Sequence, residues 1–349
     1  MSLLATTPPS LPMPPDPRDA PALRWGILGA GGIAGTFARD VPSRSAQRVV
    51  AVGSRSADKG GAFAAAHGIE RVHGSYEDLV ADPEVDAVYV ATPHSHHRDH
   101  AVLALEAGKH VLVEKAFTRS AAEAREVLAV AERQGLFAME AMWTRFLPHM
   151  VALRAVVGSG ALGEICTVTA DHGQRLDHVE RLFAPELAGG ALLDLGVYDV
   201  SFAHLLLGAP AGVRAAGVLT DRGVDLQEAV VLTYDGEHER ALAVCTASMW
   251  TASATGASVV GTDGRIDVAG PFYGSTSFVV TPRGGEAWQW PPAELAGHRY
   301  GFEYEAAEVA RCVSAGRQQS DVMPWSATLE VMGTMDEIRR QLGVVYPGE

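Results

Sequence analysis

The sequence predicts an α/β protein of two domains, the first built on a parallel sheet and the second on a large, open, mostly antiparallel sheet. Its 349 residues are enough for two domains. Up to residue 142, short apolar runs alternate with helix-compatible segments, which is typical of parallel strands joined by crossover helices. From Gly163 onward, strand-like segments follow one another with few helices between them, which favours antiparallel pairing.

The first domain is expected to cover residues 23–142. Ser120 and Glu123 form a capping box at the start of its last helix, which ends at Gln134. The other helices are expected over residues 33–40, 57–67, 75–79 and 98–107, and the strands over residues 25–28, 48–53, 85–91, 110–113 and 136–141.

The second domain is expected to cover residues 143–349. Its strands are expected over residues 164–172, 213–220, 228–234, 240–249, 257–268 and 277–281. One helix lies among them, over residues 190–207, and Gly208 is suited to end it. Two late helices, over residues 303–315 and 326–342, are able to pack back on the first domain.

Charge and cysteine content exclude several classes of protein. With 28 basic and 42 acidic residues, the formal net charge is −14, which disfavours nucleic acid or an anionic membrane as a partner. Cys166, Cys245 and Cys312 are far apart and form no C-x-x-C pair. This pattern argues against a disulfide framework or a zinc ribbon and favours a reducing cytoplasm.

The composition predicts neither a signal peptide nor a membrane-spanning segment. Residues 1–22 contain seven prolines and lack the apolar core of a signal peptide, so we expect a disordered arm. The longest uncharged stretch, residues 241–262, is interrupted by Ser, Thr and Gly and reads as paired strands. A soluble, cytoplasmic protein is expected.

A glycine-rich turn follows the first strand directly. Gly29, Gly31 and Ala34 have the spacing G-x-G-x-x-A, and a helix-compatible segment comes next. Gly29 permits a tight turn, Gly31 lets the backbone approach a pyrophosphate, and Ala34 allows close helix–strand packing. Because a helix N-terminus also attracts anions, Gly32 and Ile33 are expected to bind the cofactor as well. The motif predicts a Rossmann dinucleotide site, whereas the alternative is a glycine turn without a ligand.

The turn after the second strand favours NADP over NAD. NAD-binding folds usually place an acid there to hold the ribose, but this chain has Ser54, Arg55 and Ser56, with Lys59 shortly after. An acid would repel the 2′-phosphate of NADP, whereas a guanidinium can pair with it. The alternative is a solvated basic turn.

The third strand ends in a histidine-rich loop. His94, His96, His97 and His100 would suit zinc, but Asp99 is the only acid near them. We therefore expect a loop over the cofactor, to which Thr92, Pro93 and His97 contribute, and no metal.

Two further pairs of residues are candidates for a catalytic role. Glu114 and Lys115 end a buried strand, where doubly wound sheets bind ligands. Asp194 and Tyr198, four residues apart in the predicted helix, would lie on one face. Gly196 between them suggests that another group approaches the backbone closely. Taken alone, the Asp–Tyr pair is also compatible with a helix surface without chemistry.

Together these features resemble the glucose–fructose oxidoreductase/inositol dehydrogenase (Gfo/Idh/MocA) family over nearly all of the chain after residue 22. The residues that carry the resemblance are Gly29-x-Gly31-x-x-Ala34, Thr92-Pro93 with His97, Ala107-Gly108-Lys109-His110-Val111, Glu114-Lys115, and Gly189-Gly190-x3-Asp194-x-Gly196-x-Tyr198. The resemblance implies a Rossmann domain, an open-sheet domain and an active site between them.

Within the family, residues 139–148 and Tyr198 look like the branch of dimeric dihydrodiol dehydrogenases and NADP-dependent D-xylose dehydrogenases. That resemblance makes Lys115 the catalytic lysine, Tyr198 the acid/base and Asp194 its neighbour. The substrate side would include Trp143, Arg145 and His172. The family usually has proline after Glu-Lys, whereas this chain has Ala116.

The residues suit oxidation of a carbinol. Tyrosine, with a pKa of ~10, is too weak a base at neutral pH, but an ammonium such as Lys115 stabilises both phenolate and alkoxide. An NADP-dependent dehydrogenase or reductase for a sugar, polyol or cyclic trans-diol is expected. The alternatives are a non-enzymatic NADP-sensing regulator and a nicotinamide-dependent glycosidase of the same fold.

The second domain also predicts self-association. Residues 229–233 and 241–247 are apolar at successive positions, so both faces of their sheet require cover. Helices can cover one face, and a second copy of the chain is the simplest cover for the other. A homodimer or higher homo-oligomer through this sheet is expected.

Overall fold

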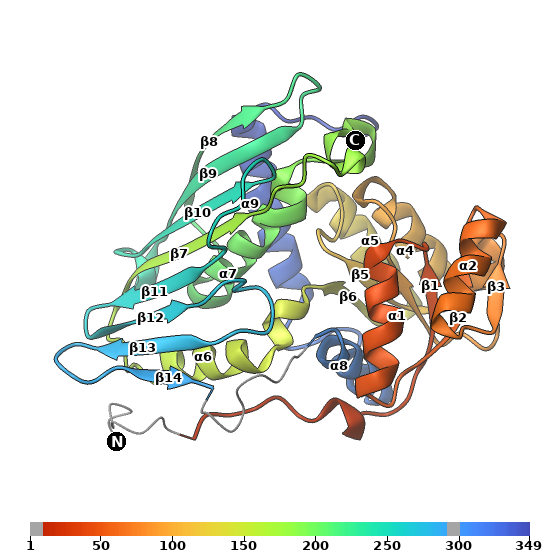
Figure 1. The fold of residues 1–349 in the computed structure, drawn as a ribbon, viewed down its shortest axis with the longest axis horizontal. Coiled ribbons are helices and arrows are strands. Elements are labelled where there is room, and N and C mark those ends of the chain that lie inside the picture. Colours follow the sequence, from red (N-terminus) through yellow and green to blue (C-terminus); the bar gives the residue numbers. More distant parts are fainter. Residues whose placement is uncertain (1–9, 292–300) are drawn as a thin grey trace. The chain divides into compact units, whose positions relative to one another are not determined.

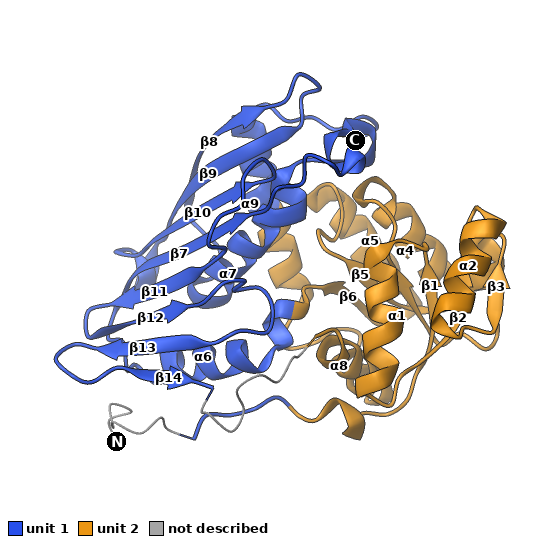
Figure 2. Cartoon of the chain, in the orientation of Figure 1, with its two compact units in different colours: residues 1–14, 144–300, 333–349 blue, residues 15–143, 301–332 orange. Residues whose placement is uncertain are grey.

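The structure is a computed structural model that describes residues 10–291 and 301–349. The chain divides into two compact units (Figure 2). The parallel-sheet unit comprises Pro15–Trp143 and Gly301–Met332, and the open-sheet unit comprises Met1–Pro14, Thr144–Tyr300 and Gly333–Glu349. The fold class predicted from the sequence, a parallel sheet followed by a large open one, is confirmed.

The parallel-sheet unit has six parallel strands in the order β3-β2-β1-β4-β5-β6, which is the order of a Rossmann fold (Figure 1). Its strands are β1 (Arg24–Leu28), β2 (Arg48–Gly53), β3 (Arg71–His73), β4 (Ala87–Val90), β5 (His110–Glu114) and β6 (Ala138–Ala141). Its helices include α1 (Gly32–Arg44), α2 (Ala57–His67), α3 (Tyr76–Val80), α4 (His97–Glu106), α5 (Ala121–Gln134) and α8 (Glu303–Ser314).

Aromatic side chains fill the core between β1, β4 and α1. Phe37 of α1 stacks on Tyr89 of β4 with ring centroids 4.0 Å apart, and meets Trp25 of β1 edge-on at 5.4 Å. All three side chains are fully buried. This packing holds α1, and with it the glycine turn, against the sheet.

The end of the arm, near residues 16–19, contacts the parallel-sheet unit. A 3₁₀ turn, Pro17–Asp19, packs on α8, and Arg311 donates a 2.7 Å hydrogen bond to the Asp16 carbonyl. Pro17 is buried because it lies in this contact. This turn is therefore ordered, and residues 1–9 of the arm lie outside the described ranges.

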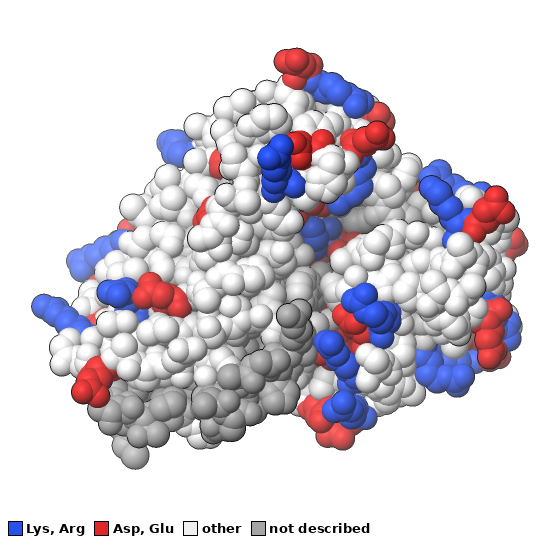
Figure 3. All heavy atoms as spheres, viewed as in Figure 1, with Lys and Arg blue, Asp and Glu red and all other residues white. Residues whose placement is uncertain are grey.

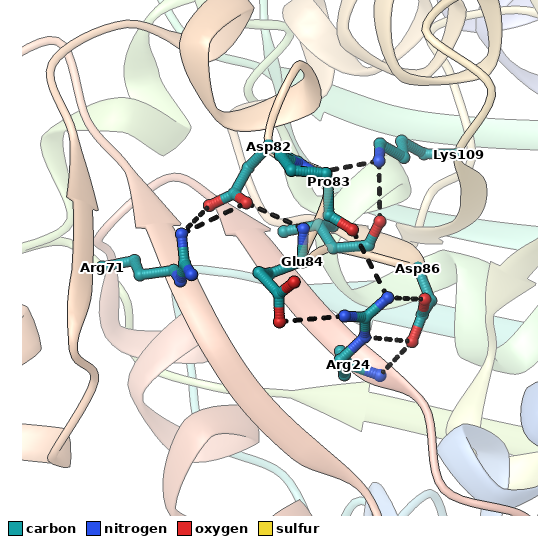
Figure 4. A network of polar contacts seen from close by, with 8 residues as sticks. Arg24, Arg71, Asp82, Pro83, Glu84, Asp86 and Lys109 are labelled. Atoms are coloured by element: carbon teal, nitrogen blue, oxygen red, sulfur yellow. Dashed lines mark hydrogen bonds and ion pairs between the residues drawn. The ribbon is translucent and has the colours of Figure 1, made fainter.

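The amino edge of the parallel sheet is tied together by ion pairs (Figure 4). The Arg24 guanidinium binds both carboxylate oxygens of Asp86, at 2.9 and 2.7 Å, and Glu84 at 3.0 Å. Lys109 donates to the carbonyls of Asp82 and Val85. A surface hollow of about 840 Å³ lies beside this network, at the edge opposite the glycine turn. Parallel sheets bind ligands at their carboxyl edge, so the hollow is not the candidate active site.

In the described residues, the open-sheet unit has eight strands in the order β14-β13-β12-β11-β7-β10-β9-β8. Among these strands, β7 and β10 pair in parallel, and the other neighbours pair antiparallel. Its elements are α6 (Pro148–Gly158), β7 (Ile165–Gly173), α7 (Val197–Leu207), β8 (Gly212–Leu219), β9 (Asp225–Thr233), β10 (Leu242–Ser248), β11 (Ala257–Gly261), β12 (Gly264–Val268), β13 (Phe278–Pro282) and β14 (Trp288–Trp290). Helix α9 (Trp325–Leu342) contributes residues to both units.

Two predictions for this sheet need correction. The single strand expected over residues 257–268 is a hairpin of β11 and β12, because the chain turns at Thr262 and Asp263. Helix α6 and strand β14 were not predicted. The apolar content of both elements, without a clear period, did not separate them from the neighbouring loops.

The helix expected over residues 190–207 is interrupted. A π-helical turn, Leu192–Gly196, precedes α7. A Cβ at Gly196 would lie 2.8 Å from Glu228 Oε1, so the close approach predicted at this glycine is confirmed. By length and composition alone, Pro185–Leu207 could cross a membrane, but 83% of its most apolar window is buried in the structure. It therefore has the character of a core helix.

Candidate active site

The glycine turn fits a dinucleotide pyrophosphate. Gly29 has φ +101°, and a Cβ there would lie 2.8 Å from the Ala91 carbonyl oxygen. Cβ atoms at Gly31 and Gly32 would meet only open space. Gly31 caps α1 without a side-chain hydrogen bond, so the first amides of the helix face an open cradle. Ala34 is buried against the sheet and Ile33 is exposed, as the predicted turn requires.

The turn after β2 presents donors for an anion. Ser56 caps α2, and its hydroxyl accepts the Lys59 N–H. Ser54 is buried, and its hydroxyl accepts the Ser56 N–H. The Arg55 side chain is exposed, and its charge helps burial to lower the pKa of His96. A helix N-terminus, two hydroxyls and two cations thus meet at one turn, which suits a 2′-phosphate.

Two of the histidines after β4, His94 and His97, bind backbone carbonyl groups. Both ring nitrogens of His97 lie at hydrogen-bond distance from carbonyl oxygens, 2.7 Å from Thr92 and 2.9 Å from Ala116. Burial lowers the pKa of His97 to about 4. His94 donates to the Lys115 carbonyl, at 3.2 Å. Among residues 10–291 and 301–349, no three side chains of His, Cys, Asp or Glu form a metal site. The hydrogen bonds of His94 and His97 join the loop that contains Thr92 and Pro93 to the turn after β5.

Lys115 lies on that turn, between two fixed peptide groups. Its N–H donates to Glu114 Oε2 at 3.2 Å, and the buried Glu114 carboxylate also accepts the Tyr89 hydroxyl. The Lys115–Ala116 peptide bond is cis. Phe117 N–H donates to Glu140 at 3.1 Å. Contacts on both sides therefore hold the backbone of Lys115 at the carboxyl end of β5.

Trp143 and Arg145, both predicted near substrate, have different surroundings. The Trp143 ring is half-buried and stacks on Phe302 at 4.8 Å within the parallel-sheet unit. Arg145 is buried and donates to the Ser201 hydroxyl at 2.9 Å and to the Ser201 carbonyl at 3.2 Å. Because its guanidinium is bound to α7, Arg145 supports that helix, and its assignment as a substrate-binding residue stays a prediction.

Tyr198 belongs to a cluster of rings in the open-sheet unit. His172, at the end of β7, lies 5.4 Å from the Tyr198 ring, and Tyr273 lies 4.8 Å from it. Tyr273 also stacks on His172 at 4.4 Å, and Gln174 donates to its hydroxyl at 3.0 Å. The sequence predicted Tyr198 and His172 but missed Tyr273 and Gln174. Tyr273 follows Pro271 in a glycine-flanked loop with no periodic pattern, so only the aromatic residue itself was a signal.

Asp194, in the π-helical turn, is buried and paired. Arg181 donates a 3.0 Å hydrogen bond to Asp194 Oδ1, and the arginine side chain is half-exposed. Burial and then the charge of Asp194 raise the pKa of Tyr273, while the Gln174 hydrogen bond lowers it. Asp194 is therefore an electrostatic neighbour of the ring cluster.

Comparisons with known proteins identify two family domains. The oxidoreductase family with an NAD-binding Rossmann fold matches residues 23–142, and the GFO/IDH/MocA C-terminal domain matches residues 150–267.

Curated relatives match the chain over most of its length. It is 39% identical to a trans-1,2-dihydrobenzene-1,2-diol dehydrogenase of Danio rerio, over 93% of this chain and 98% of that protein. It is 37% identical to a D-xylose 1-dehydrogenase (NADP(+)) of Hypocrea jecorina, over 93% of each.

Solved structures also match the chain over most of its length. An aldose–aldose oxidoreductase from Caulobacter crescentus, complexed with glycerol, has a TM-score of 0.83 at 25% identity and covers 93% of this chain and 98% of its own. A 3-ketoreductase from Actinomadura kijaniata, in complex with NADP, has a TM-score of 0.77 at 28% identity and covers 92% and 98%.

Proposed function

The chain belongs to the Gfo/Idh/MocA family of oxidoreductases, and we propose that its substrate is a sugar, polyol or cyclic trans-diol and its cofactor NADP. Dehydrogenases of this kind act on hydroxyl groups, and the nicotinamide exchanges a hydride with the substrate carbon. The relatives named above act on a trans-dihydrodiol and on D-xylose, which supports the substrate class.

The preference for NADP rests on the turn after β2. Arg55 is exposed beside the N-terminus of α2, and the Ser54 and Ser56 hydroxyls flank it. A carboxylate would be needed there to favour the free ribose of NAD, and none occupies residues 54–56. The D-xylose dehydrogenase relative uses NADP, which supports the same choice.

Tyr198 is the acid/base that we propose for the transfer of the substrate's hydroxyl proton. In oxidation, Tyr198 takes the proton of the substrate hydroxyl while hydride leaves the carbon that bears this hydroxyl. The Lys115 ammonium stabilises the phenolate and the negative charge that develops on the substrate oxygen. Asp194, whose carboxylate pairs with Arg181, is the neighbour that orients one of these two residues. The observation that supports the proposal is the ring cluster of His172, Tyr198 and Tyr273, in which the buried Tyr198 ring packs against an imidazole and a second phenol.

Aromatic side chains provide the walls of the proposed substrate site. Trp143, held by its stack on Phe302, and His172, stacked on Tyr273, are the substrate contacts that we propose. Aromatic faces pack well against the C–H face of such rings while polar tips meet the hydroxyls.

We also propose a homodimer through the outer face of the open sheet. Val231 pairs with Val244 of β10 and Arg214 of β8, so these three side chains share a face. Val218, Val231 and Leu242 on this face are 49%, 37% and 44% exposed. The opposite face is buried, because α7 packs on β7 and β10. A second copy of the same face is the cover that we propose.

The cysteines suit the cytoplasm. Cys245 and Cys312 are buried, Cys166 is half-buried, and all three are free thiols. Free thiols persist in a reducing compartment, and we place the enzyme there.

One panel of substrates tests the function. The purified protein is mixed with NADP⁺ or NAD⁺ and with a series of aldoses and cyclic trans-diols, and NADPH or NADH is followed by absorbance. We expect NADPH formation with members of this series and faster turnover with NADP⁺. Binding of NADPH without turnover of any substrate would indicate a regulator, whereas hydrolysis of glycosides without free NADPH would indicate a glycosidase.

On the face shown in Figure 3, basic and acidic side chains of the described residues are interspersed over both units. Nucleic-acid binding requires a continuous basic surface. This distribution, with the net charge of −14, makes the regulator the weaker alternative.

A further inference from the structure

Tyr273 is fixed in position by its backbone and by two rings. Its carbonyl accepts a 2.7 Å hydrogen bond from the Thr144 hydroxyl. The preceding residue, Phe272, donates its N–H to the Thr255 carbonyl at 2.9 Å, and its own carbonyl accepts His149 Nε2 at 3.0 Å. The Tyr273 ring then packs against both His172 and Tyr198, at the distances given above. A loop anchored in this way presents its side chain with little entropy left to lose.

The hydrogen bonds around His172 determine whether the Tyr273 hydroxyl donates or accepts its hydrogen bond with Gln174. His172 Nδ1 lies 3.2 Å from the Leu195 carbonyl, which can only accept, so Nδ1 carries the proton. The neutral ring therefore leaves Nε2 as an acceptor, and Gln174 donates its amide N–H to Nε2 at 2.8 Å. The opposite amide orientation would place Gln174 Oε1 against the lone pair of Nε2.

The same Gln174 amide nitrogen donates to the Tyr273 hydroxyl oxygen, at 3.0 Å. Because that oxygen accepts from Gln174, the hydroxyl proton of Tyr273 is directed to a different acceptor. Accepting one hydrogen bond also polarises the O–H group and strengthens the hydrogen bond that it donates.

Electrostatics keep this phenol protonated. Burial and the nearby Asp194 carboxylate raise the pKa of Tyr273 above its usual value near 10, although the Gln174 hydrogen bond opposes them. At neutral pH Tyr273 is thus a hydrogen-bond donor, whereas Tyr198 beside it is assigned to proton transfer. The two adjacent phenols differ in role because their neighbours differ.

We propose that Tyr273 donates a hydrogen bond to the substrate hydroxyl next to the reacting carbinol, and so selects sugars and vicinal diols over substrates that lack this second hydroxyl. This inference rests on the proposed function, and names the residue that gives the substrate class its second point of recognition. The oxygens of a vicinal diol are on neighbouring carbons, and the rings of Tyr198 and Tyr273 lie side by side, 4.8 Å apart at an angle of 31°. Each phenol can therefore meet one of the two oxygens.

The test compares matched substrates that differ by one hydroxyl. The pairs are trans-cyclohexane-1,2-diol with cyclohexanol, and D-glucose with 2-deoxy-D-glucose, each oxidised with NADP⁺. The measured quantity is the ratio of kcat/KM within a pair. We expect the unmodified protein to favour the substrate with both hydroxyls, and Tyr273→Phe to lower that ratio about tenfold, as the loss of one neutral hydrogen bond implies.

A second variant tests the direction of the hydrogen bond. In Gln174→Glu the carboxylate accepts the Tyr273 proton, so the tyrosine hydroxyl remains but no longer donates to substrate. We expect the ratio to fall as it does in Tyr273→Phe. The matched control is Tyr234→Phe, which also removes a buried phenol oxygen from the open-sheet unit, at the opposite end of β9 from the β10 and β7 carboxyl ends. The control should keep the ratio of the unmodified protein.

Each outcome of these measurements either supports or overturns the role inferred for Tyr273. An unchanged ratio in Tyr273→Phe, or equal preference by the unmodified protein within both pairs, overturns the inference and leaves the proposed function intact. If the analogue with one hydroxyl reacts too slowly to measure, a tenfold loss of kcat/KM with the diol in Tyr273→Phe, absent in Tyr234→Phe, supports the inference, and no loss overturns it. Failure of the unmodified protein to form NADPH with any substrate overturns the proposed function and this inference with it.

Discussion

The residues assigned to catalysis are held by neighbours that do no chemistry. His94 binds the carbonyl of Lys115, and Glu114 binds its N–H. The ring of Tyr198 packs beside His172, whose Nδ1 in turn binds the Leu195 carbonyl of the π-helical turn. Positions fixed before the substrate arrives reduce the reorganisation that the reaction requires.

Lys115 and Tyr198 are expected to act as one unit. Lys115→Met should leave NADP binding largely intact and lower kcat by orders of magnitude, because the ammonium acts on charge that develops in the transition state. Tyr198→Phe should lower kcat about 10²–10⁴-fold, since proton transfer loses its acid/base. In the double variant, kcat should be little lower than in the poorer single variant.

Steady-state kinetics with NADPH titration separate the two steps of binding and turnover in these variants. Circular dichroism checks that they fold. Full activity of Tyr198→Phe would transfer the acid/base role to another group, with Lys115 as the next candidate.

Arg55 is expected to set the cofactor preference. A charge-assisted pair with the 2′-phosphate is worth about 1.5–3 kcal/mol, so Arg55→Ala should weaken NADPH binding more than tenfold and change NADH binding little. Fluorescence titration of both cofactors measures the effect. Arg48→Ala is the matched control, because Arg48 is an exposed arginine at the other end of β2. Tighter binding of NADH than of NADPH by the unmodified protein would contradict the prediction.

At the scale of elements, α7 rests on buried carboxyl groups. Asp199 of α7 and Glu228 of β9 are buried, and neither oxygen of the Asp199 carboxylate has a hydrogen-bond partner among the described residues. Burial first, then Asp171, raises the pKa of Asp199 well above its usual range; burial and the carboxylates of Asp225 and Asp199 do the same for Glu228. These groups are therefore protonated in the folded protein at pH values where the unfolded chain has lost the protons.

Asp199→Asn should change how stability depends on pH. Because the folded pKa of Asp199 is raised, the stabilising effect of its proton is complete below the unfolded pKa of about 4 and is lost as pH rises toward the folded pKa, by about 1.4 kcal/mol per pH unit. Asparagine does not titrate, so the variant should gain stability relative to the unmodified protein between pH 5 and pH 8. Urea unfolding at both pH values measures this. Parallel stability profiles would contradict the prediction.

For the whole molecule, the outer face of the open sheet is expected to control assembly. Val231→Glu would place a charge in the centre of the proposed interface, where no partner charge compensates it. The unmodified protein should have a mass of about 74 kDa by light scattering, twice the 36.8 kDa of one chain, and the variant should approach one chain. Val72→Glu, at an exposed valine of β3 in the other unit, is the control. A monomer mass for the unmodified protein at micromolar concentration would refute the dimer.

The sequence by itself determined the fold class and the turns after β1 and β2, because their signals are local. Strand β2 and helix α2 occupy the predicted ranges 48–53 and 57–67, since an apolar run and the Ser56 cap mark them directly. The requirement for glycine at position 29 follows from the turn itself, and its φ of +101° confirms it. The roles of Lys115 and Tyr198 came from the family resemblance and remain predictions.

Only the tertiary structure decided how distant segments share one site. An apolar pattern is the same for an α-helix and for the π-helical turn at Leu192–Gly196, so the interruption could not be foreseen. Arg145 and Ser201 are 56 residues apart in the sequence, and only folding brings the buried guanidinium to the serine hydroxyl. Tyr273 carried no pattern, yet pairing of β7 with β11 and the anchored loop after β12 bring its ring to Tyr198 and His172. The physical reason is that periodicity reports the neighbours of a residue along the chain, whereas side-chain partners across a sheet depend on strand pairing and on the loops that follow it.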